Sequence, residues 1–424
     1  MKGKHYRLHR ELSLFQAVLY GIGIILGAGI YVLLGVGAGI AGNAIWLSFL
    51  VAAFIAFFTG MSYAELSSMY SKDAAEYVYT EKAFRRKRLS FIVQWVMIFT
   101  GIVSSATVAL GFGGYFERLT GIPAVAGAAL LIYVLSIISY IGIKLSTAFA
   151  TYSAIIEMSG LLLVAVIGAF FIGGDINYFY SPGGMAGILS ATALIFFAYI
   201  GFEEMVQFSE ETKNARKVMP KALLISLAVS TVLYMLVSVS AISVLGWEAL
   251  SKSSAPLADV VAKALPEAAF LMSVIALFAT GNTVLIMLIV ASRILYGLGN
   301  THAMPKVLSF VGRRGTPYVS IFIVMVLSII ALSVGGLKTV ALLTDVGIFL
   351  VYVFVNAALI WLRYREPKAE RLFISPVNIG KFPVLAGLGI LASVLMFFHF
   401  EPEILLFEIG VVLAGFGAYR LINR

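Results

Sequence analysis

The sequence predicts an all-α polytopic membrane protein with twelve membrane-spanning helices, and three observations lead to this fold class. Hydrophobic residues make up 61% of the 424 residues and charged residues only 12%, which is too little polar surface to cover a soluble protein of this size. Long apolar runs recur between clusters of charged residues, and most of them reach the roughly 20 residues that a helix needs to cross a bilayer. The Lys and Arg residues also fall almost entirely on one side of such a topology.

The twelve spans follow from apolar runs that end at charged or turn-forming residues. The first six are expected at 14–41, 44–68, 90–114, 123–143, 147–172 and 187–209. The second six are expected at 219–245, 268–297, 318–335, 339–362, 382–399 and 403–421. The basic stretch at 1–13 precedes a run that is too long for a cleavable signal peptide, so it is expected to be a cytoplasmic tail. A missed or merged span is the alternative to a count of twelve.

The basic residues predict the orientation of the chain in the membrane. An even number of spans places both termini on one side. Only Arg118, Lys252, Lys263 and Lys338 of the 30 Lys and Arg residues fall on the other side. The side of the termini is therefore expected to be the cytoplasm, with the chain in the cell membrane. The net charge of +9 then reflects topology and contact with anionic lipid, so we expect the bilayer, and no nucleic acid, as a partner.

The composition also excludes several chemistries. The chain has no Cys, which removes disulfides, thiol catalysis and Cys-based metal sites. Its four His residues do not have the spacing of metal ligands. Because no nucleophile or metal set is evident, we do not expect an enzyme, a bound metal or an organic cofactor.

Two expected spans contain features that interrupt a helix. The first has Gly at positions 21, 23, 27, 29, 35, 37 and 39, and each costs a helix about 1 kcal/mol relative to Ala. A break near Gly27–Gly29 is therefore inexpensive, although such glycines also allow close packing of membrane helices. The sixth span contains Gly201, Glu203 and Glu204. A charge in hydrocarbon costs at least about 2.5 kcal/mol, so these carboxylates must face protein or water.

Interruptions in corresponding positions indicate a transporter built from two inverted repeats, with its site at the bilayer midplane. The first repeat is expected at 14–172, the second at 187–362, and two peripheral spans at 382–421. Free amides at the start of one half-helix favour an anion, and free carbonyls at the end of another favour a cation. A zwitterion such as an amino acid fits both.

Five motifs in order along the chain resemble the amino acid, polyamine and organocation family of secondary transporters. They are Gly27–Tyr31; Tyr63–Leu66 with Glu76–Tyr79 and Ala83–Phe84; Phe197–Glu203; Ser209–Glu211 with Pro220; and Ser292–Tyr296 with Met304–Pro305 and Thr316–Pro317. The resemblance covers nearly the whole chain. It implies a core of ten helices, in which spans 1, 2, 6 and 7 rock against the rest to give alternating access.

The resemblance also implies a set of substrate contacts. The substrate carboxylate would bind the backbone amides of Gly27, Ala28 and Gly29. Its α-ammonium would bind the carbonyls of Ile25, Phe197, Ala198 and Ile200. The ring of Phe197 would close over the substrate as a gate; an ordinary packing role is the alternative. Small and aromatic residues nearby suit small or hydrophobic neutral amino acids, while a cationic substrate bound by Glu203 or Asp345 is an alternative.

Glu157 is the foremost candidate for energy coupling. It lies in the fifth span on a helix face with Ser153, Gly160, Val164 and Gly168. A carboxylate at the midplane is costly, so Glu157 is a candidate for carrying a coupling proton. Two other roles stay open: a static hydrogen bond between spans five, one and eight, and sodium ligation with Thr280 or Thr283. Glu203 is a second candidate, interpreted first as an anchor for the half-helix ends.

We expect roles other than energy coupling for the remaining acidic residues in or near the spans. Glu65 is expected to be solvated or part of a gate, Asp345 to form a structural hydrogen bond, and Glu408 to lie at an interface outside the core. The favoured function is proton-coupled uptake of an amino acid. An obligatory exchanger and a sodium symporter are the alternatives within the family, and a membrane amino acid sensor is the alternative outside it. The sequence does not indicate an oligomeric state.

Overall fold

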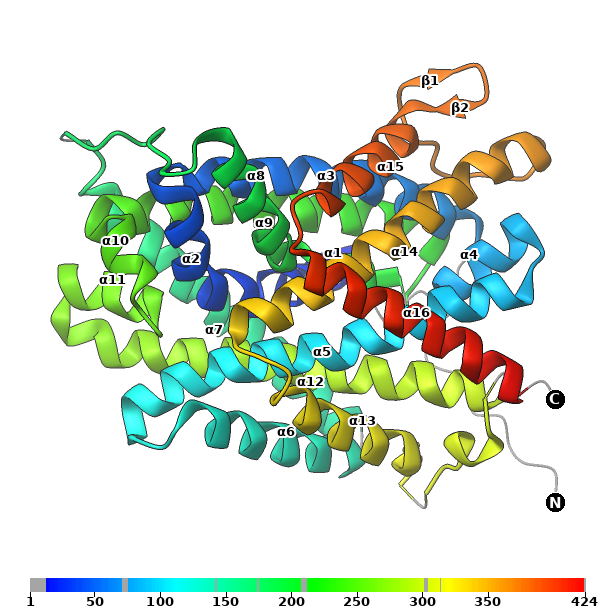
Figure 1. Ribbon diagram of the computed structural model, residues 1–424, viewed down its shortest axis with the longest axis horizontal. Coiled ribbons are helices and arrows are strands. Elements are labelled where there is room, and N and C mark those ends of the chain that lie inside the picture. The colour runs from blue at the N-terminus through cyan, green and yellow to red at the C-terminus, as the bar shows by residue number, and fades with distance from the viewer. Residues whose placement is uncertain are drawn as a thin grey trace.

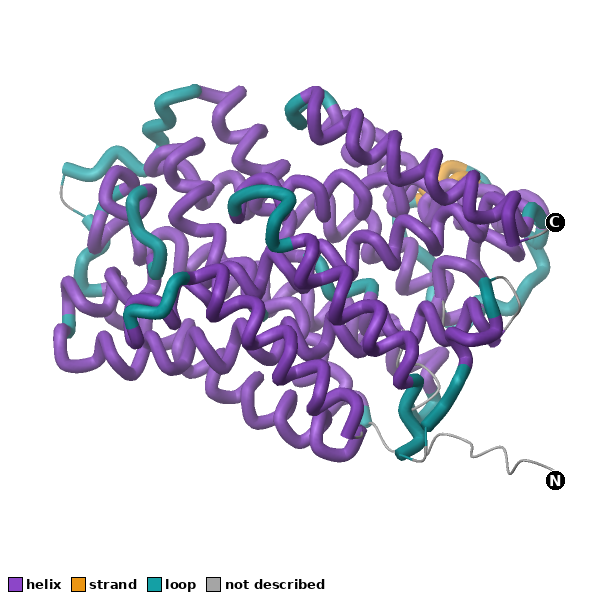
Figure 2. Tube along the Cα trace, turned by 60° about the horizontal axis from the view of Figure 1, so that its bottom comes forward, coloured by secondary structure: helices purple, strands orange, loops and turns teal. Residues whose placement is uncertain are grey.

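The computed structural model describes residues 13–70, 75–141, 143–173, 175–206, 212–300, 304–312 and 314–422. Nearly all of this trace is helical (Figure 2). Within the described residues, nine helical segments are long and apolar enough to cross a membrane, and the first of them, Leu14–Met69, covers two expected spans. Two shorter apolar helices, Tyr318–Ala331 and Val384–Phe397, accompany them. The chain is therefore an all-α polytopic membrane protein.

The first half of the chain forms seven helices and one short 3-10 turn. They are α1 (Leu14–Leu26), α2 (Ala28–Ala41), η1 (Gly42–Ala44), α3 (Ile45–Met69), α4 (Ala75–Phe84), α5 (Lys87–Thr120), α6 (Ala124–Ile141) and α7 (Ile143–Ala169). Ser13 caps α1, because its hydroxyl accepts from the amide of Gln16 and the Gln16 side chain accepts from the amide of Ser13. The rest of the tail expected at 1–13 lies outside the described residues.

The second half begins with α8 (Gly184–Ile195), η2 (Phe196–Tyr199), α9 (Ala215–Leu245), α10 (Trp247–Ser251), α11 (Pro256–Ala264) and η4 (Pro266–Ala268). It continues with α12 (Ala269–Asn300), η5 (Lys306–Ser309), α13 (Tyr318–Ala331), α14 (Leu337–Arg365), β1 (Asn378–Ile379), β2 (Phe382–Pro383), α15 (Val384–Phe397) and α16 (Pro402–Ile422). The motif Ser209–Glu211 lies outside the described residues. Helices α4 and α10–α11 were not expected from the sequence, since they are short and contain charged residues rather than being long and apolar.

Two helix ends differ from the expected spans for identifiable reasons. Helix α5 continues to Thr120 because Gly113 and Gly114 lie against the backbone of Ala124 and Ser254, so they provide close approach rather than a helix end. Helix α15 begins at Val384 rather than 382, because Phe382 and Pro383 pair with β1 in a two-stranded antiparallel hairpin.

The helices pack around a large buried apolar core, and the most extensive contacts join α5 to α12, α3 to α9, and α5 to α14. Helix α4 and the β1–β2 hairpin lie at one end of the molecule, and α10 and α11 lie at the opposite end (Figure 1). This arrangement leaves both interrupted helices inside the bundle. Leu26 and Ile195, where α1 and α8 end, are both fully buried.

Candidate functional site

The first span is broken at Gly27. Helix α1 ends at Leu26 and α2 begins at Ala28, while the Gly27 backbone has φ −23° and ψ −136°, which lies outside the helical region. The last carbonyls of α1 and the first amides of α2 therefore lack partners within their own helices. A side chain at Gly27 would overlap the hydroxyl of Thr283 in α12, so Gly is required there. The predicted interruption at Gly27–Gly29 is confirmed.

The sixth span is broken after Ile195. The chain passes through η2 and then turns at Gly201, whose φ of +122° strongly favours glycine. A Cβ at Gly201 would also lie 2.5 Å from Cγ2 of Ile24. The interruption predicted in this span is therefore confirmed, and it faces the end of α1.

The two breaks are in direct contact, although they are far apart in the sequence. A Cβ at Gly29 would overlap the Cα of Ala198, so the start of α2 lies against the second break without room for a methyl group. Ile25, Phe197, Ala198 and Ile200 are all buried. The structure thus brings predicted site residues from both breaks into contact, with Gly29 against Ala198.

Tyr234 in α9 joins the two breaks, and the sequence analysis did not identify it. Its hydroxyl donates to the carbonyl of Ala198, at 2.6 Å, and to the carbonyl of Ile25. These are two of the carbonyls expected to bind the substrate ammonium. A signal for this residue is present in the sequence: Ser226, Ser230 and Tyr234 recur at a spacing of four on one buried face of α9.

Helix α14 packs against the second break through one face. The rings of Phe349 and Phe196 are 4.4 Å apart between centroids, and Asp345, one turn earlier, lies beside the backbone of Phe197. Asp345 is buried, and neither carboxyl oxygen has a hydrogen-bond partner among the described residues. The backbone of Phe197 lies close enough to interact with the Asp345 carboxyl group, so the structural hydrogen bond expected for Asp345 stays a prediction.

Glu203 is held at the second break by two donors. Its Oε2 accepts from the amide of Gly201 at 3.1 Å and from the hydroxyl of Tyr352, in α14, at 2.9 Å. The other carboxyl oxygen has no partner within the described residues. These contacts fit the anchoring role for Glu203, because they tie the turn after η2 to α14.

Glu157 lies on a buried face of α7. Ser153, Gly160, Val164 and Gly168 share this face and are buried with it. Gly160 packs closely on Ile275 of α12, and the Tyr31 hydroxyl donates to the backbone carbonyl of Glu157 at 2.7 Å. The carboxyl oxygens of Glu157 have no hydrogen-bond partner among the described residues. Tyr31 therefore binds the helix backbone and leaves the carboxyl group unpaired.

The candidate sodium ligands lie on α12. The hydroxyl of Thr283 faces Gly27 and donates to the carbonyl of Ala279 at 3.2 Å, while the hydroxyl of Thr280 donates to that of Ala276 at 2.7 Å. Across the described residues, no three His, Asp or Glu side chains gather as a metal site.

Two other acidic residues lie outside the breaks. Glu65 is fully buried and forms a bidentate pair with Arg363, with both N–O distances 2.6 Å, and a second pair with Arg371 at 3.1 Å. The expectation of a solvated carboxylate is wrong, because the segment after α14 folds over Glu65. Glu408 is buried where α16 meets Gly347 of α14, which agrees with the expected interface position.

A polytopic helical bundle in which two interrupted helices meet belongs to the architectures used by membrane transporters. The sequence matches the model of the amino acid permease family over residues 12–411, and the chain belongs to that family. This confirms the resemblance to the amino acid, polyamine and organocation transporters. The family and the similar proteins are permeases and transporters, not enzymes.

Several curated proteins are similar over most of the chain. The branched-chain amino acid permease BcaP of Bacillus subtilis (strain 168) is 30% identical over 98% of this chain and 94% of that protein. The methylthioribose transporter of the same organism is 29% identical over 88% of this chain and 86% of that protein. Cationic amino acid transporter 4 of Mus musculus is 27% identical over 88% of this chain and 63% of that protein.

Proposed function

We propose that this permease moves an amino acid across the cell membrane by alternating access, with the substrate bound between the two breaks. The contact between Gly29 and Ala198, next to the Tyr234 hydroxyl that joins the carbonyls of Ile25 and Ala198, is the observation that carries this proposal. It brings amides at the start of α2 next to the carbonyls of Ile25 and Ala198, which lie outside regular helical bonding and share the Tyr234 hydroxyl, and a zwitterion needs both kinds of group. Opening this contact would admit the substrate.

The proposed contacts pair the substrate carboxylate with backbone amides and its α-ammonium with backbone carbonyls. The amides of Gly27, Ala28 and Gly29 bind the carboxylate, and the carbonyls of Ile25, Phe197, Ala198 and Ile200 receive the α-ammonium. The ammonium takes the place of the Tyr234 hydroxyl, because both donate to the Ile25 and Ala198 carbonyls. Phe197 acts as the gate, and its buried position at the break supports this role.

We assign the core to two inverted repeats, 14–172 and 187–362, with 382–421 peripheral and twelve spans in all. Helix packing supports the repeat. Helix α3 packs on α9, α5 packs on α12, and α2 packs on α8, so each pair joins a helix to its counterpart five spans later. Interlocked halves of this kind allow one bundle to rock against the other. The Lys and Arg distribution supports cytoplasmic termini.

The favoured mode is proton-coupled uptake, with Glu157 as the proton site. Its carboxyl group is buried and unpaired on the face of α7 that contacts α1 and α12, whereas the Glu203 carboxylate is held as an anchor. The alternatives are obligatory exchange and sodium symport, for which Thr283 at the first break is the candidate ligand.

The favoured substrate is a neutral, hydrophobic amino acid such as leucine. The apolar residues around the breaks and the name of the Bacillus subtilis permease support it. A cationic amino acid is the alternative, because the buried carboxyl group of Asp345 beside Phe197 and the name of the mouse transporter favour a positive side chain.

Uptake into proteoliposomes tests the proposal. Labelled leucine should accumulate when the outside is made acidic, and unlabelled amino acids in competition should rank the substrates. Accumulation that is driven by a sodium gradient without any pH gradient would show that sodium, rather than the proton, is the coupling ion. Counterflow without accumulation would indicate an exchanger. Binding without uptake or counterflow would contradict a transporter and favour a sensor.

A further inference from the structure

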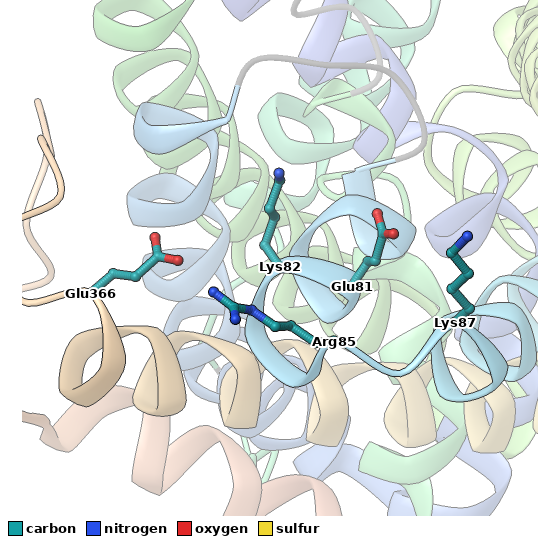
Figure 3. A pocket seen from close by; sticks show the side chains of 5 residues that line it. All are labelled: Glu81, Lys82, Arg85, Lys87 and Glu366. Atoms are coloured by element: carbon teal, nitrogen blue, oxygen red, sulfur yellow. The ribbon is translucent and has the colours of Figure 1, made fainter.

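A basic turn joins α4 to α5 at one end of the bundle. Lys82 and Arg85–Arg88 are exposed along it. A hollow of about 270 Å³ opens there, lined by Glu81, Lys82, Arg85, Lys87 and Glu366 (Figure 3). In Figure 3, Glu81, Lys82 and Lys87 extend to the same side of the turn, while Arg85 extends toward the side from which Glu366 comes.

The cations around this hollow lack partners. None of Lys82, Arg85 and Lys87 forms an ion pair within the described part of the chain, although two carboxylates line the same hollow. Glu366 instead accepts from the hydroxyl of Tyr70 at 3.2 Å. The nearby basic residues Arg363 and Arg371 form ion pairs with Glu65. Three positive side chains are therefore available to an external anion.

The backbone adds a second attraction for an anion. Helix α5 is 34 residues long and begins at Lys87, and its N-cap residue, Arg86, provides no side-chain hydrogen bond to the first turn. The first amides of α5 thus receive no bond from the cap side chain, and because Lys87 both begins α5 and lines the hollow, the positive end of the helix dipole favours negative charge there. Phosphate groups commonly bind at such helix starts.

Aromatic residues place the hollow at the membrane surface. Trp361 and Tyr364 in α14 are each 55% exposed, and the ring of Trp361 lies 6.3 Å from that of Phe84 at the end of α4. The guanidinium of Arg88 lies 4.6 Å from the ring centre of Phe416 in α16. Exposed Trp and Tyr residues concentrate at the level of lipid headgroups. The anions concentrated at this level are lipid headgroups.

We propose that the hollow binds the headgroup of an anionic phospholipid with free hydroxyls, of which phosphatidylglycerol is the probe. Lys82, Arg85, Lys87 and the first amides of α5 bind the phosphate. Glu81 and Glu366 accept hydrogen bonds from the headgroup hydroxyls, which explains why carboxylates line an otherwise basic site. The proposal depends on the protein being embedded in a membrane and is independent of what it transports.

Thermal unfolding of the detergent-solubilised protein tests the proposal, because a ligand of the folded state raises the midpoint with its concentration. Phosphatidylglycerol should raise the midpoint of the unaltered protein, and phosphatidylcholine should not. The triple variant Lys82→Gln, Arg85→Gln, Lys87→Gln should bind phosphatidylglycerol roughly 100-fold more weakly, since each basic residue near a membrane surface contributes roughly fivefold.

The matched control removes the same charge elsewhere. Lys213, Lys217 and Lys221 are exposed at and just before the start of α9, and their triple change to Gln should weaken binding by less than about fivefold. Equal losses in the two triple variants would overturn the proposal in favour of diffuse attraction. If the first triple variant does not fold, Lys87→Gln and Lys217→Gln replace the triples, with a roughly fivefold loss expected only for the former.

Inorganic phosphate and phosphatidic acid are two further ligands that distinguish a soluble anion from a lipid headgroup and test the role of the headgroup hydroxyls. Inorganic phosphate should not match phosphatidylglycerol at equal concentration; if it does, the hollow binds a soluble anion and the lipid assignment is wrong. Phosphatidic acid, which lacks headgroup hydroxyls, should bind more weakly than phosphatidylglycerol. Binding of phosphatidic acid at least as tightly would overturn the role given to Glu81 and Glu366.

Discussion

The hydroxyl of Tyr234 lies 2.6 Å from the carbonyl oxygen of Ala198, and the same hydroxyl donates to the carbonyl of Ile25. The single proton of this side chain in α9 is therefore shared between a carbonyl of each interrupted helix. If the substrate ammonium binds these two carbonyls as proposed, it must displace the hydroxyl, and substrate binding would then loosen the contact between α1 and η2.

The first prediction concerns the loss of that hydroxyl. Tyr234→Phe leaves the carbonyls of Ile25 and Ala198 without their donor, and an unpaired buried polar group costs about 1–3 kcal/mol. The thermal unfolding midpoint without substrate should fall. Saturating leucine, or the amino acid that the uptake panel selects, should raise the midpoint more in the variant than in the unaltered protein, because its ammonium restores a donor.

Tyr115→Phe is the control for this prediction. The hydroxyl of Tyr115 donates to the backbone carbonyl of Tyr31 at 2.8 Å, outside the two breaks. This variant should lose a similar amount of stability but respond to substrate like the unaltered protein. An equal substrate response in both variants would show that Tyr234 does not compete with the ammonium.

The second prediction concerns the contact between the breaks. Gly29→Ala places a methyl group on the Cα of Ala198, and over-packing of this kind costs about 1–3 kcal/mol, occasionally more. The closed conformation should be destabilised, with a lower unfolding midpoint and little uptake. Gly410→Ala in α16 is the control, since nothing lies within 4 Å of a Cβ there. Normal uptake by Gly29→Ala would contradict a tight contact at this point.

The sequence predicted the breaks because their chemistry is local. Gly27 and Gly201 lower the stability of a helix whatever its neighbours are. An acidic residue such as Glu203 within a membrane span must face protein or water. Apolar length alone likewise predicts most spans. Short helices such as α4 escape that criterion, because α4 has only 10 residues and carries charged residues near both ends.

Partners between distant segments could not be predicted in the same way. Tyr234 resembles many other membrane tyrosines in the sequence, and only the fold brings it to Ile25 and Ala198. Glu65 stands at the end of a span, where exposure is the ordinary expectation. It is buried because Arg363 and Arg371 pack over it and pair with its carboxylate. The hydrogen bond from Arg363 spans 298 positions of the sequence.

The third prediction contrasts that buried pair with an exposed one. Arg363→Met removes the bidentate partner of Glu65 and leaves a buried carboxylate with only Arg371 and the Ser375 amide among the described residues, and breaking a buried pair typically costs about 3–5 kcal/mol. Lys338→Met breaks a pair with Glu401 in which both side chains are about half exposed, so it should cost at most about 1 kcal/mol. Unfolding midpoints of the two variants compare the effects. Similar small losses would mean that Glu65 does not depend on its arginines.

The last prediction separates Glu157 from the other buried acids. Glu157→Gln keeps the shape of the side chain but cannot exchange a proton, so accumulation of leucine driven by a pH gradient should be lost, while counterflow in preloaded vesicles continues. Glu408→Gln changes another buried carboxyl group without hydrogen-bond partners among the described residues, at the contact of α16 with α14. It should keep the pH-driven accumulation, because it lies outside the interrupted helices. Unchanged pH dependence in Glu157→Gln would remove Glu157 from coupling, and the same loss in both variants would attribute the effect to a general disturbance of buried carboxyl groups.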